Sequence, residues 1–167
     1  MRELKTKKLA YLSLAVALSM VLSFVESQIP PLAAVPGVKL GLANIVTVFL
    51  IYTVGWKEAG GVSIIRVALS SLLFGSAVSF IYSASGAFVS FFGMLLLKKT
   101  GKFSEIGVSV TGGVLHNGAQ ILAACIVMDN AAISLWLPPL IISGTLSGIF
   151  VGILAALLAK RLKGKIK

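Results

Sequence analysis

Long apolar runs alternate with short polar connections along the whole chain. The runs cover residues 9–27, 40–55, 59–75, 77–97, 106–128 and 138–159. A helix that crosses a bilayer needs about 20 mostly apolar residues, within a range of about 17–25. The pattern therefore predicts six transmembrane helices, of which the second and third are short. Five spans are the alternative, if the second run enters the membrane without crossing it.

The composition favours the same class of fold. Hydrophobic residues make up 57% of the 167 residues and charged residues 12%, whereas soluble domains average about 45–50% and about 25%. A soluble protein of this length could not bury so much apolar surface. We therefore expect an all-α, polytopic helix bundle in a lipid bilayer, with residues 1–167 forming a single integral membrane domain.

The basic residues lie mainly at alternate ends of the apolar runs. They precede the first run, separate the second from the third and the fourth from the fifth, and follow the sixth: Arg2, Lys5, Lys7, Lys8, Lys57, Lys98, Lys99, Lys102, Lys160, Arg161, Lys163, Lys165 and Lys167. Cytoplasmic loops of membrane proteins carry the excess of Lys and Arg. Six spans therefore place both termini in the cytoplasm. The same placement argues against nucleic acid as the partner that a net charge of +10 would otherwise suggest.

Two of the predicted spans carry strongly polar residues near their middles. Arg66 stands in the third run, and His116, Asn117 and Gln120 stand in the fifth. An ionisable side chain at the centre of a spanning helix costs about 2.5–3.5 kcal/mol on insertion scales, so it is a functional candidate by default. The similar depth of the two groups predicts one shared polar site. The alternative is that these side chains only join helices by hydrogen bonds.

The stretch between the first two runs, "ESQIPPLAAVPGVKLGLANIV", combines polar residues with helix-breaking prolines and glycines. The expected topology places it on the outer side of the membrane. We expect Glu26, Lys39 and Asn44 to line the outer mouth of a cavity whose floor holds the four residues above, with Lys39 and Arg66 attracting an anionic group. A Glu26–Lys39 pair that merely ties the loop together is the alternative.

Small residues recur every four positions in the last span and, more loosely, in the first. Gly144, Gly148 and Gly152 form the stronger pattern, and Ser13 and Ala17 form the weaker one. Such spacing allows a second helix to approach closely. It predicts packing within the bundle or, alternatively, docking of a partner protein.

Several kinds of catalytic site are absent from the sequence. No two of the five acidic residues lie within ten positions of each other, and the chain has one histidine and one cysteine. It therefore offers no carboxylate cluster for magnesium, no zinc site and no nucleophile triad. No P-loop is present either. We expect binding or translocation rather than catalysis, with no metal and no cofactor.

Four strings of the sequence are similar to one known family. "ESQIP", "PGVKLGLANIVTVFLIY", "LHNGAQI" and the "SG" that opens the glycine pattern resemble heptaprenyl diphosphate synthase component I, also called Gx transporter proteins. These are bacterial membrane proteins, which implies a multi-pass protein of the inner membrane. They are similar in size to the substrate-binding subunits of energy-coupling-factor (ECF) transporters, which bind a vitamin-like ligand from outside and dock on a scaffold driven by two ATPases.

Three classes of function follow from the residues and the resemblance. The first is a substrate-binding membrane subunit of a transporter, which binds a small anionic, vitamin-like or isoprenoid-related ligand and has an ECF-type scaffold and ATPases as partners. The second is a non-catalytic accessory subunit of heptaprenyl diphosphate synthesis, or of a quinone or redox system, with a soluble prenyl diphosphate synthase as partner. The third is a stand-alone carrier or scaffold.

Overall fold

The computed structural model describes residues 2–28, 41–74 and 76–162, and these residues form helices joined by short connections. In chain order the helices are α1 (Arg2–Gln28), α2 (Asn44–Thr53), α3 (Trp56–Phe74), α4 (Ala77–Thr100), α5 (Glu105–Val127), the 3-10 helix η1 (Ala131–Trp136) and α6 (Leu137–Leu162). The prediction of an all-α fold is confirmed. Each predicted run corresponds to one α-helix, with ends that differ by at most a few residues except at the two termini of the chain.

Serine and glycine residues set the ends of α4 and α5. The Ser76 and Ser104 hydroxyls accept hydrogen bonds from backbone N–H groups three residues later, at 3.2 Å each, which satisfies donors that the first turn leaves free. Gly101 ends α4 with φ of 67°, a left-handed conformation that glycine adopts without steric cost. The chain can therefore reverse direction in very few residues.

Four of the described helices are long and apolar enough to cross a membrane: Thr6–Gln28, Ala77–Thr100, Glu105–Val127 and Ala131–Leu162. Large apolar side chains point outward around the bundle, for example Leu72 at 80% exposure and Leu122 at 63%. An apolar surface of this extent requires a covering of lipid or partner protein. The chain is therefore a membrane protein.

Helix α2 departs from the prediction of six full spans. It has 10 residues, which at 1.5 Å per residue span about 15 Å, half of the roughly 30 Å hydrocarbon core. All residues from Ile45 to Ile51 are buried inside the protein. The second run is apolar because other helices surround it, so its apolar length does not report a membrane crossing. The structure confirms six α-helices over the described residues, and the number of full crossings stays a prediction.

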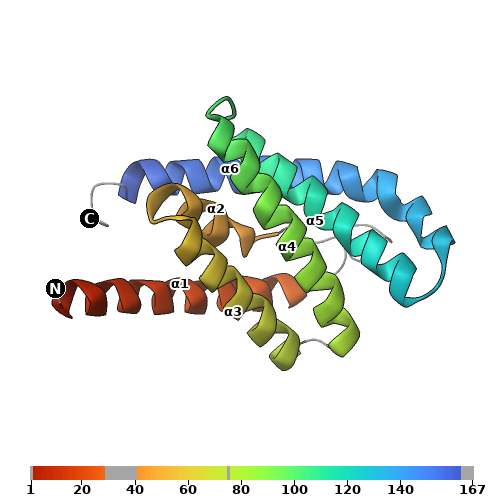
Figure 1. The fold of residues 1–167 in the computed structure, drawn as a ribbon, viewed down its shortest axis with the longest axis horizontal. Helices are drawn as coiled ribbons and strands as arrows, with labels where there is room; N and C mark the ends of the chain where they lie inside the picture. Colours follow the sequence, from red (N-terminus) through yellow and green to blue (C-terminus); the bar gives the residue numbers. More distant parts are fainter. Residues whose placement is uncertain (1, 29–40, 75, 163–167) are drawn as a thin grey trace.

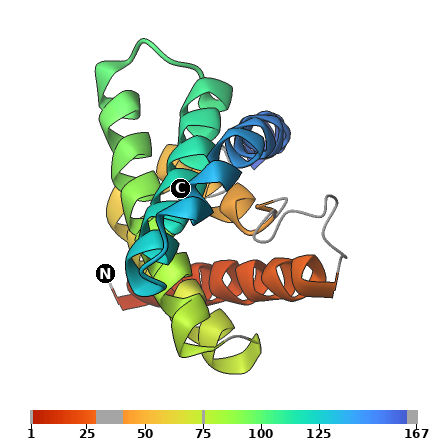
Figure 2. The same cartoon turned by 90° about the vertical axis from the view of Figure 1, so that its right-hand side faces the viewer.

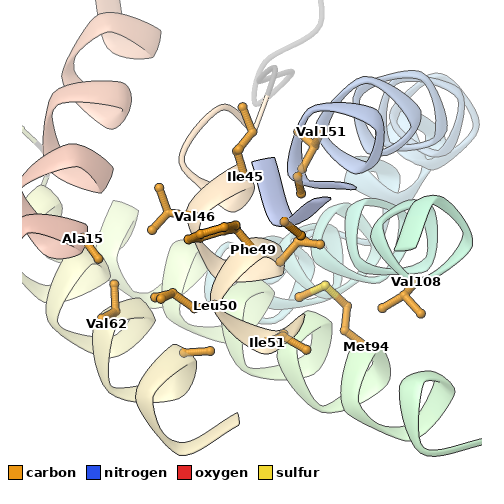
Figure 3. Packing of buried hydrophobic residues seen from close by; sticks show 14 residues of the cluster. Ala15, Ile45, Val46, Phe49, Leu50, Ile51, Val62, Met94, Val108 and Val151 are labelled. Atoms are coloured by element: carbon orange, nitrogen blue, oxygen red, sulfur yellow. The ribbon is translucent and has the colours of Figure 1, made fainter. Parts of the chain in front are cut away.

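Helix α2 lies in the centre of the hydrophobic core. Figure 3 shows the α2 side chains Val46, Phe49 and Leu50 among Ala15 of α1, Val62 of α3 and buried residues of α4, α5 and α6. Contacts with α3 and α6 are the most numerous, and α1 and α5 also reach it. This short helix therefore joins the two sides of the bundle.

The longer helices form two groups on either side of α2. Helix α1 packs against α3, whereas α5 packs extensively against both α6 and α4 (Figure 1, Figure 2). The start of α1 and the end of α6 lie on the same side of the molecule (Figure 1). On that side Lys8 of α1 forms an ion pair with Glu58 of α3.

The glycine face of α6 lies directly against α5. A Cβ atom on Gly148 would stand 2.6 Å from the Cα atom of Val110, and one on Gly152 would stand 2.7 Å from that of Ile106. Gly144 meets Gly113 in the same way. These contacts are between backbones, so this face packs within the bundle. Ser13 and Ala17 lie instead on the exposed face of α1, where no described helix covers them.

Candidate functional site

A cavity of about 300 Å³ opens among the helices near the end where α3 turns into α4. Its lining comes from all six α-helices and the turn before α2: Ser23, Glu26, Ser27, Gly41, Asn44, Arg66, Val67, Ser70, Ser71, Phe74, Ser79, Ser83, Gly113, His116, Asn117, Gln120 and Ser147. Most of these side chains are polar. In a bundle covered by apolar surface, a polar cavity is the natural place for a hydrophilic ligand.

Most of the site residues predicted from the sequence come together at this cavity. The lining includes Glu26, Asn44, Arg66, His116, Asn117 and Gln120, which come from four different helices. Lys39, the remaining member of the predicted set, lies outside the described residues. The expected proximity of the third and fifth runs is therefore observed, and ligand binding by these residues stays a prediction.

Arg66 occupies the interior of the cavity. It stands eight residues before the end of α3, which corresponds to a depth of about 12 Å along the helix. Its Nη2 atom lies 3.4 Å from Asn44 Oδ1, a long hydrogen bond. Its Nε atom is buried and has no hydrogen-bond partner among the described residues. The guanidinium therefore keeps one hydrogen-bond donor that the described residues leave unpaired.

Glu26 links the end of α1 to the turn before α2. Its Oε1 atom accepts a hydrogen bond from the backbone N–H of Gly41, a residue with φ of 68° that favours glycine. The Glu26 carboxylate also attracts the Arg66 guanidinium. Glu26 thus both holds the turn that presents Asn44 and balances part of the positive charge inside the cavity.

Residues of α5 form the opposite wall. His116 and Gln120 lie against Gly86 of α4, where a Cβ atom would stand 2.9 Å from His116 Cε1 and 3.0 Å from Gln120 Cγ. Asn117 differs from them, because its Nδ2 atom donates to the backbone carbonyl of Leu140 in α6 at 2.7 Å. This buried bond commits the amide nitrogen to packing, as the structural alternative for Asn117 expects. The amide of Gln120 makes no hydrogen bond to a described residue and stays available.

Sequence reasoning did not identify most of the serine residues that line the cavity. Seven are present: Ser23, Ser27, Ser70, Ser71, Ser79, Ser83 and Ser147. Two pairs, Ser23 with Ser27 and Ser79 with Ser83, are four residues apart and so share a helix face. That spacing was the available signal. It is weak alone, because single serines are common in spanning helices.

A second, apolar groove lies between α3 and α4. It encloses about 510 Å³, with Gly60, Gly61 and Ala68 on the α3 side and Phe80, Phe88 and Phe91 among the residues on the α4 side. Lys57 and Trp56 stand at the end where α3 begins. The groove is suited to a hydrocarbon chain rather than to a hydrophilic molecule.

The described residues contain no group of three or more His, Cys, Asp or Glu side chains that could hold a metal ion. Arg66, the amides and the hydroxyls instead provide hydrogen-bond donors and a positive charge. Such an arrangement binds and orients an anionic or hydroxylated molecule.

Comparison with known proteins identifies one family. Residues 15–158 match the family described as heptaprenyl diphosphate synthase component I. No curated protein and no solved structure matches the chain. The match covers most of the chain, including every helix that lines the cavity. This membrane protein therefore belongs to the heptaprenyl diphosphate synthase component I family.

Proposed function

We propose that this protein is the substrate-binding membrane subunit of a transporter and that it binds a small molecule with an anionic group in the cavity. The observation that carries the proposal is Arg66, whose guanidinium lies inside a polar cavity and keeps a buried N–H without a partner among the described residues. An arginine at such depth is costly. A ligand that pairs with it offsets this cost.

The placement of basic residues supports an opening toward the outside of the cell. Lys8, Lys57, Lys98 and Lys160 stand at the helix ends away from the cavity. Under the positive-inside rule those ends are cytoplasmic, so the cavity opens on the outer side of the inner membrane. On this proposal both termini lie in the cytoplasm, and partner subunits, an ECF-type scaffold with ATPases, supply the energy that this chain has no P-loop to provide.

Replacement of Arg66 tests the assignment. Wild-type protein and the variants Arg66→Ala, Arg66→Lys and Arg161→Ala are purified from native membranes, and the small molecules that they carry are measured by mass spectrometry. Arg161→Ala is the matched control, because Arg161 is exposed at the end of α6. We expect the bound molecule to be retained by wild type and Arg161→Ala and lost from Arg66→Ala.

The outcomes of this retention assay separate two roles for Arg66. Undiminished retention by a well-expressed Arg66→Ala protein contradicts the proposed site. Failure of that variant to insert, with Arg66→Lys inserted and still loaded, indicates that the charge is needed for folding as well as binding. Failure of both variants to insert indicates a structural role, as the alternative from the sequence expects.

A second function is favoured by the apolar groove and by the description of the family. A groove of about 510 Å³ with aromatic walls suits an isoprenoid chain, as an accessory subunit of prenyl diphosphate synthesis would require. On that alternative the protein is non-catalytic and its partner is a soluble prenyl diphosphate synthase. Crosslinking in native membranes followed by purification distinguishes the candidates: scaffold and ATPase subunits support the transporter, a soluble synthase supports the accessory subunit, and no partner favours a stand-alone carrier.

A further inference from the structure

Four serines from α1, α3 and α4, here called the serine wall, belong to the cavity lining. Ser23, Ser71, Ser79 and Ser83 line the cavity, and none of them donates or accepts a side-chain hydrogen bond with another described residue. Ser85, two residues beyond Ser83, lies outside the cavity and donates to the carbonyls of Ile81 and Tyr82 at 2.9 and 3.0 Å. Back-bonding of this kind is the usual way in which a helix satisfies serine.

These serine hydroxyls have hydrogen-bonding capacity that an occupant of the cavity can use. Each hydroxyl has one donor and two acceptor sites, and the four serines are only partly buried, so their hydroxyls are open to the cavity. The four serines come from three helices that surround one space, so a single molecule or a water cluster can reach them together. A molecule that bears several hydroxyls satisfies more of these sites than a hydrocarbon or an aromatic ring can.

The charges of the described lining residues match an occupant with one anionic group. Arg66 is the one cationic side chain and Glu26 the one carboxylate among the described lining residues. A single guanidinium matches one carboxylate through paired hydrogen bonds. A diphosphate would place several negative charges beside Glu26 and one arginine, which like-charge repulsion disfavours.

The depths of the Arg66 guanidinium and of the serine hydroxyls define how an occupant is oriented in the cavity. Arg66 stands about 12 Å from the end of α3, whereas Ser71 stands about 4.5 Å from that end and Ser79 about 3 Å from the start of α4, at 1.5 Å per residue. The Ser71 and Ser79 hydroxyls are therefore nearer to the α3–α4 end, and the guanidinium is deeper. Phe74 is the one aromatic ring of Phe, Tyr or Trp type in the described lining, so stacking contributes little.

We infer that the occupant of the cavity is a small, non-aromatic, polyhydroxylated compound with one anionic group, of the sugar-acid class, whose carboxylate lies at Arg66 and whose hydroxyls meet the serine wall. This inference rests on the proposed function and narrows its ligand. The inference also assigns different ligands to the polar cavity and to the apolar groove between α3 and α4, because an isoprenoid chain fits the groove and not the cavity.

Three probes test the inference on the full-length protein in lipid nanodiscs. Gluconate carries both the carboxylate and the hydroxyls, hexanoate has the same chain length and carboxylate without them, and sorbitol has the hydroxyls without the charge. Equilibrium binding of each is measured by competition. We expect gluconate to bind at least about tenfold more tightly than either of the others, a difference of about 1.4 kcal/mol. Equal or tighter binding of hexanoate, or no measurable binding of gluconate, overturns the inference.

Serine variants test whether the serine wall is responsible for the selectivity for gluconate. In the double variant Ser79→Ala/Ser83→Ala we expect about a tenfold loss of gluconate affinity, since the variant removes two hydroxyl groups that hydrogen-bond the ligand. The control Ser85→Ala removes a hydroxyl of the same helix outside the cavity and is expected to bind gluconate as wild type does. Equal effects of the double variant and the control contradict a role for the wall.

The retention assay distinguishes failure of this inference from failure of the proposed function. A molecule that depends on Arg66 but lacks hydroxyl groups overturns the sugar-acid class and leaves the binding subunit in place. A polyhydroxylated acid that depends on Arg66 supports both. Absence of any Arg66-dependent molecule, together with absence of gluconate binding, contradicts both.

Discussion

Gly86 of α4 lies so close to His116 of α5 that a Cβ atom there would stand 2.9 Å from the imidazole Cε1 atom. The same Cβ atom would stand 3.0 Å from Gln120 Cγ. Both side chains line the cavity, so the absence of a side chain at residue 86 determines where this wall of the cavity can be.

Gly86→Ala is expected to weaken binding more than it lowers stability. The added methyl group moves the His116 and Gln120 side chains, and the higher helix propensity of alanine, about 0.5–1 kcal/mol relative to glycine, offsets part of the cost of that shift. We expect about a tenfold loss in the retention assay and a melting temperature close to that of wild type. Gly118→Ala is the control on α5, because a Cβ atom there meets no atom within 4 Å. Equal retention by both variants would contradict the role of Gly86.

Gly113→Ala is expected to destabilise the contact between α5 and α6. Its Cβ atom would stand 2.3 Å from the backbone oxygen of Gly144, and a backbone atom cannot move without shifting its whole helix. Overpacking of this kind costs about 1–3 kcal/mol. Thermal unfolding in detergent measures the loss. Gly61→Ala, where the new Cβ atom meets nothing within 4 Å, is expected to show no loss.

Asn117→Ala and Gln120→Ala are expected to have different effects although both residues line the cavity. Asn117 donates to the Leu140 carbonyl, so its removal costs stability of about 1 kcal/mol. Gln120 has no hydrogen bond to a described residue, so its removal lowers retention of the bound molecule and changes stability little. The paired measurement is the melting temperature and the retention of each variant. A reversed pattern would show that the roles are assigned wrongly.

The ion pair between Lys8 and Glu58 is expected to make a small, pH-dependent contribution. The hydrogen bond from Lys8, followed by a backbone hydrogen bond, lowers the pKa of Glu58 below its ordinary value. The contribution to stability is therefore fully present above the ordinary carboxyl pKa and is lost as pH falls through the lowered pKa. Both groups are partly exposed, so we expect less than about 1 kcal/mol.

Thermal unfolding of wild type, Glu58→Gln, Lys8→Met and the double variant between about pH 7 and about pH 3 tests this pair. The single and double variants are expected to lose the same increment at neutral pH, because each removes the same interaction. They are expected to converge with wild type at the acidic limit. A difference that grows as the pH falls would contradict the assignment.

The helices could be predicted from the sequence because the signal is local. The apolar run 77–97 and the helix Ala77–Thr100 begin at the same residue, and the run 138–159 begins one residue after the start of α6. The run 40–55 was interpreted as a short span because an apolar sequence does not tell whether lipid or protein covers it. The structure places α2 in the core, and whether it crosses the membrane stays a prediction.

The charged and amide residues of the candidate site could also be predicted. Arg66 and His116 are each unusual within an apolar run, so the cost of burial marks them individually. The serines are not marked in this way. Their presence at the cavity depends on the rotation and depth of the helices relative to one another, which no single segment encodes.

The sequence by itself determined that the chain is a helical membrane protein, where most of its helices lie and which costly polar groups they carry, because each of these depends on the transfer energy of a local segment. The tertiary structure alone decided that α2 is a core helix, that Asn117 bonds to α6 and that serines of four helices line the same cavity as Arg66. These features depend on which helix faces pack together. Close contacts such as that between Gly113 and Gly144 set this packing, and they arise from pairs of residues far apart in the chain.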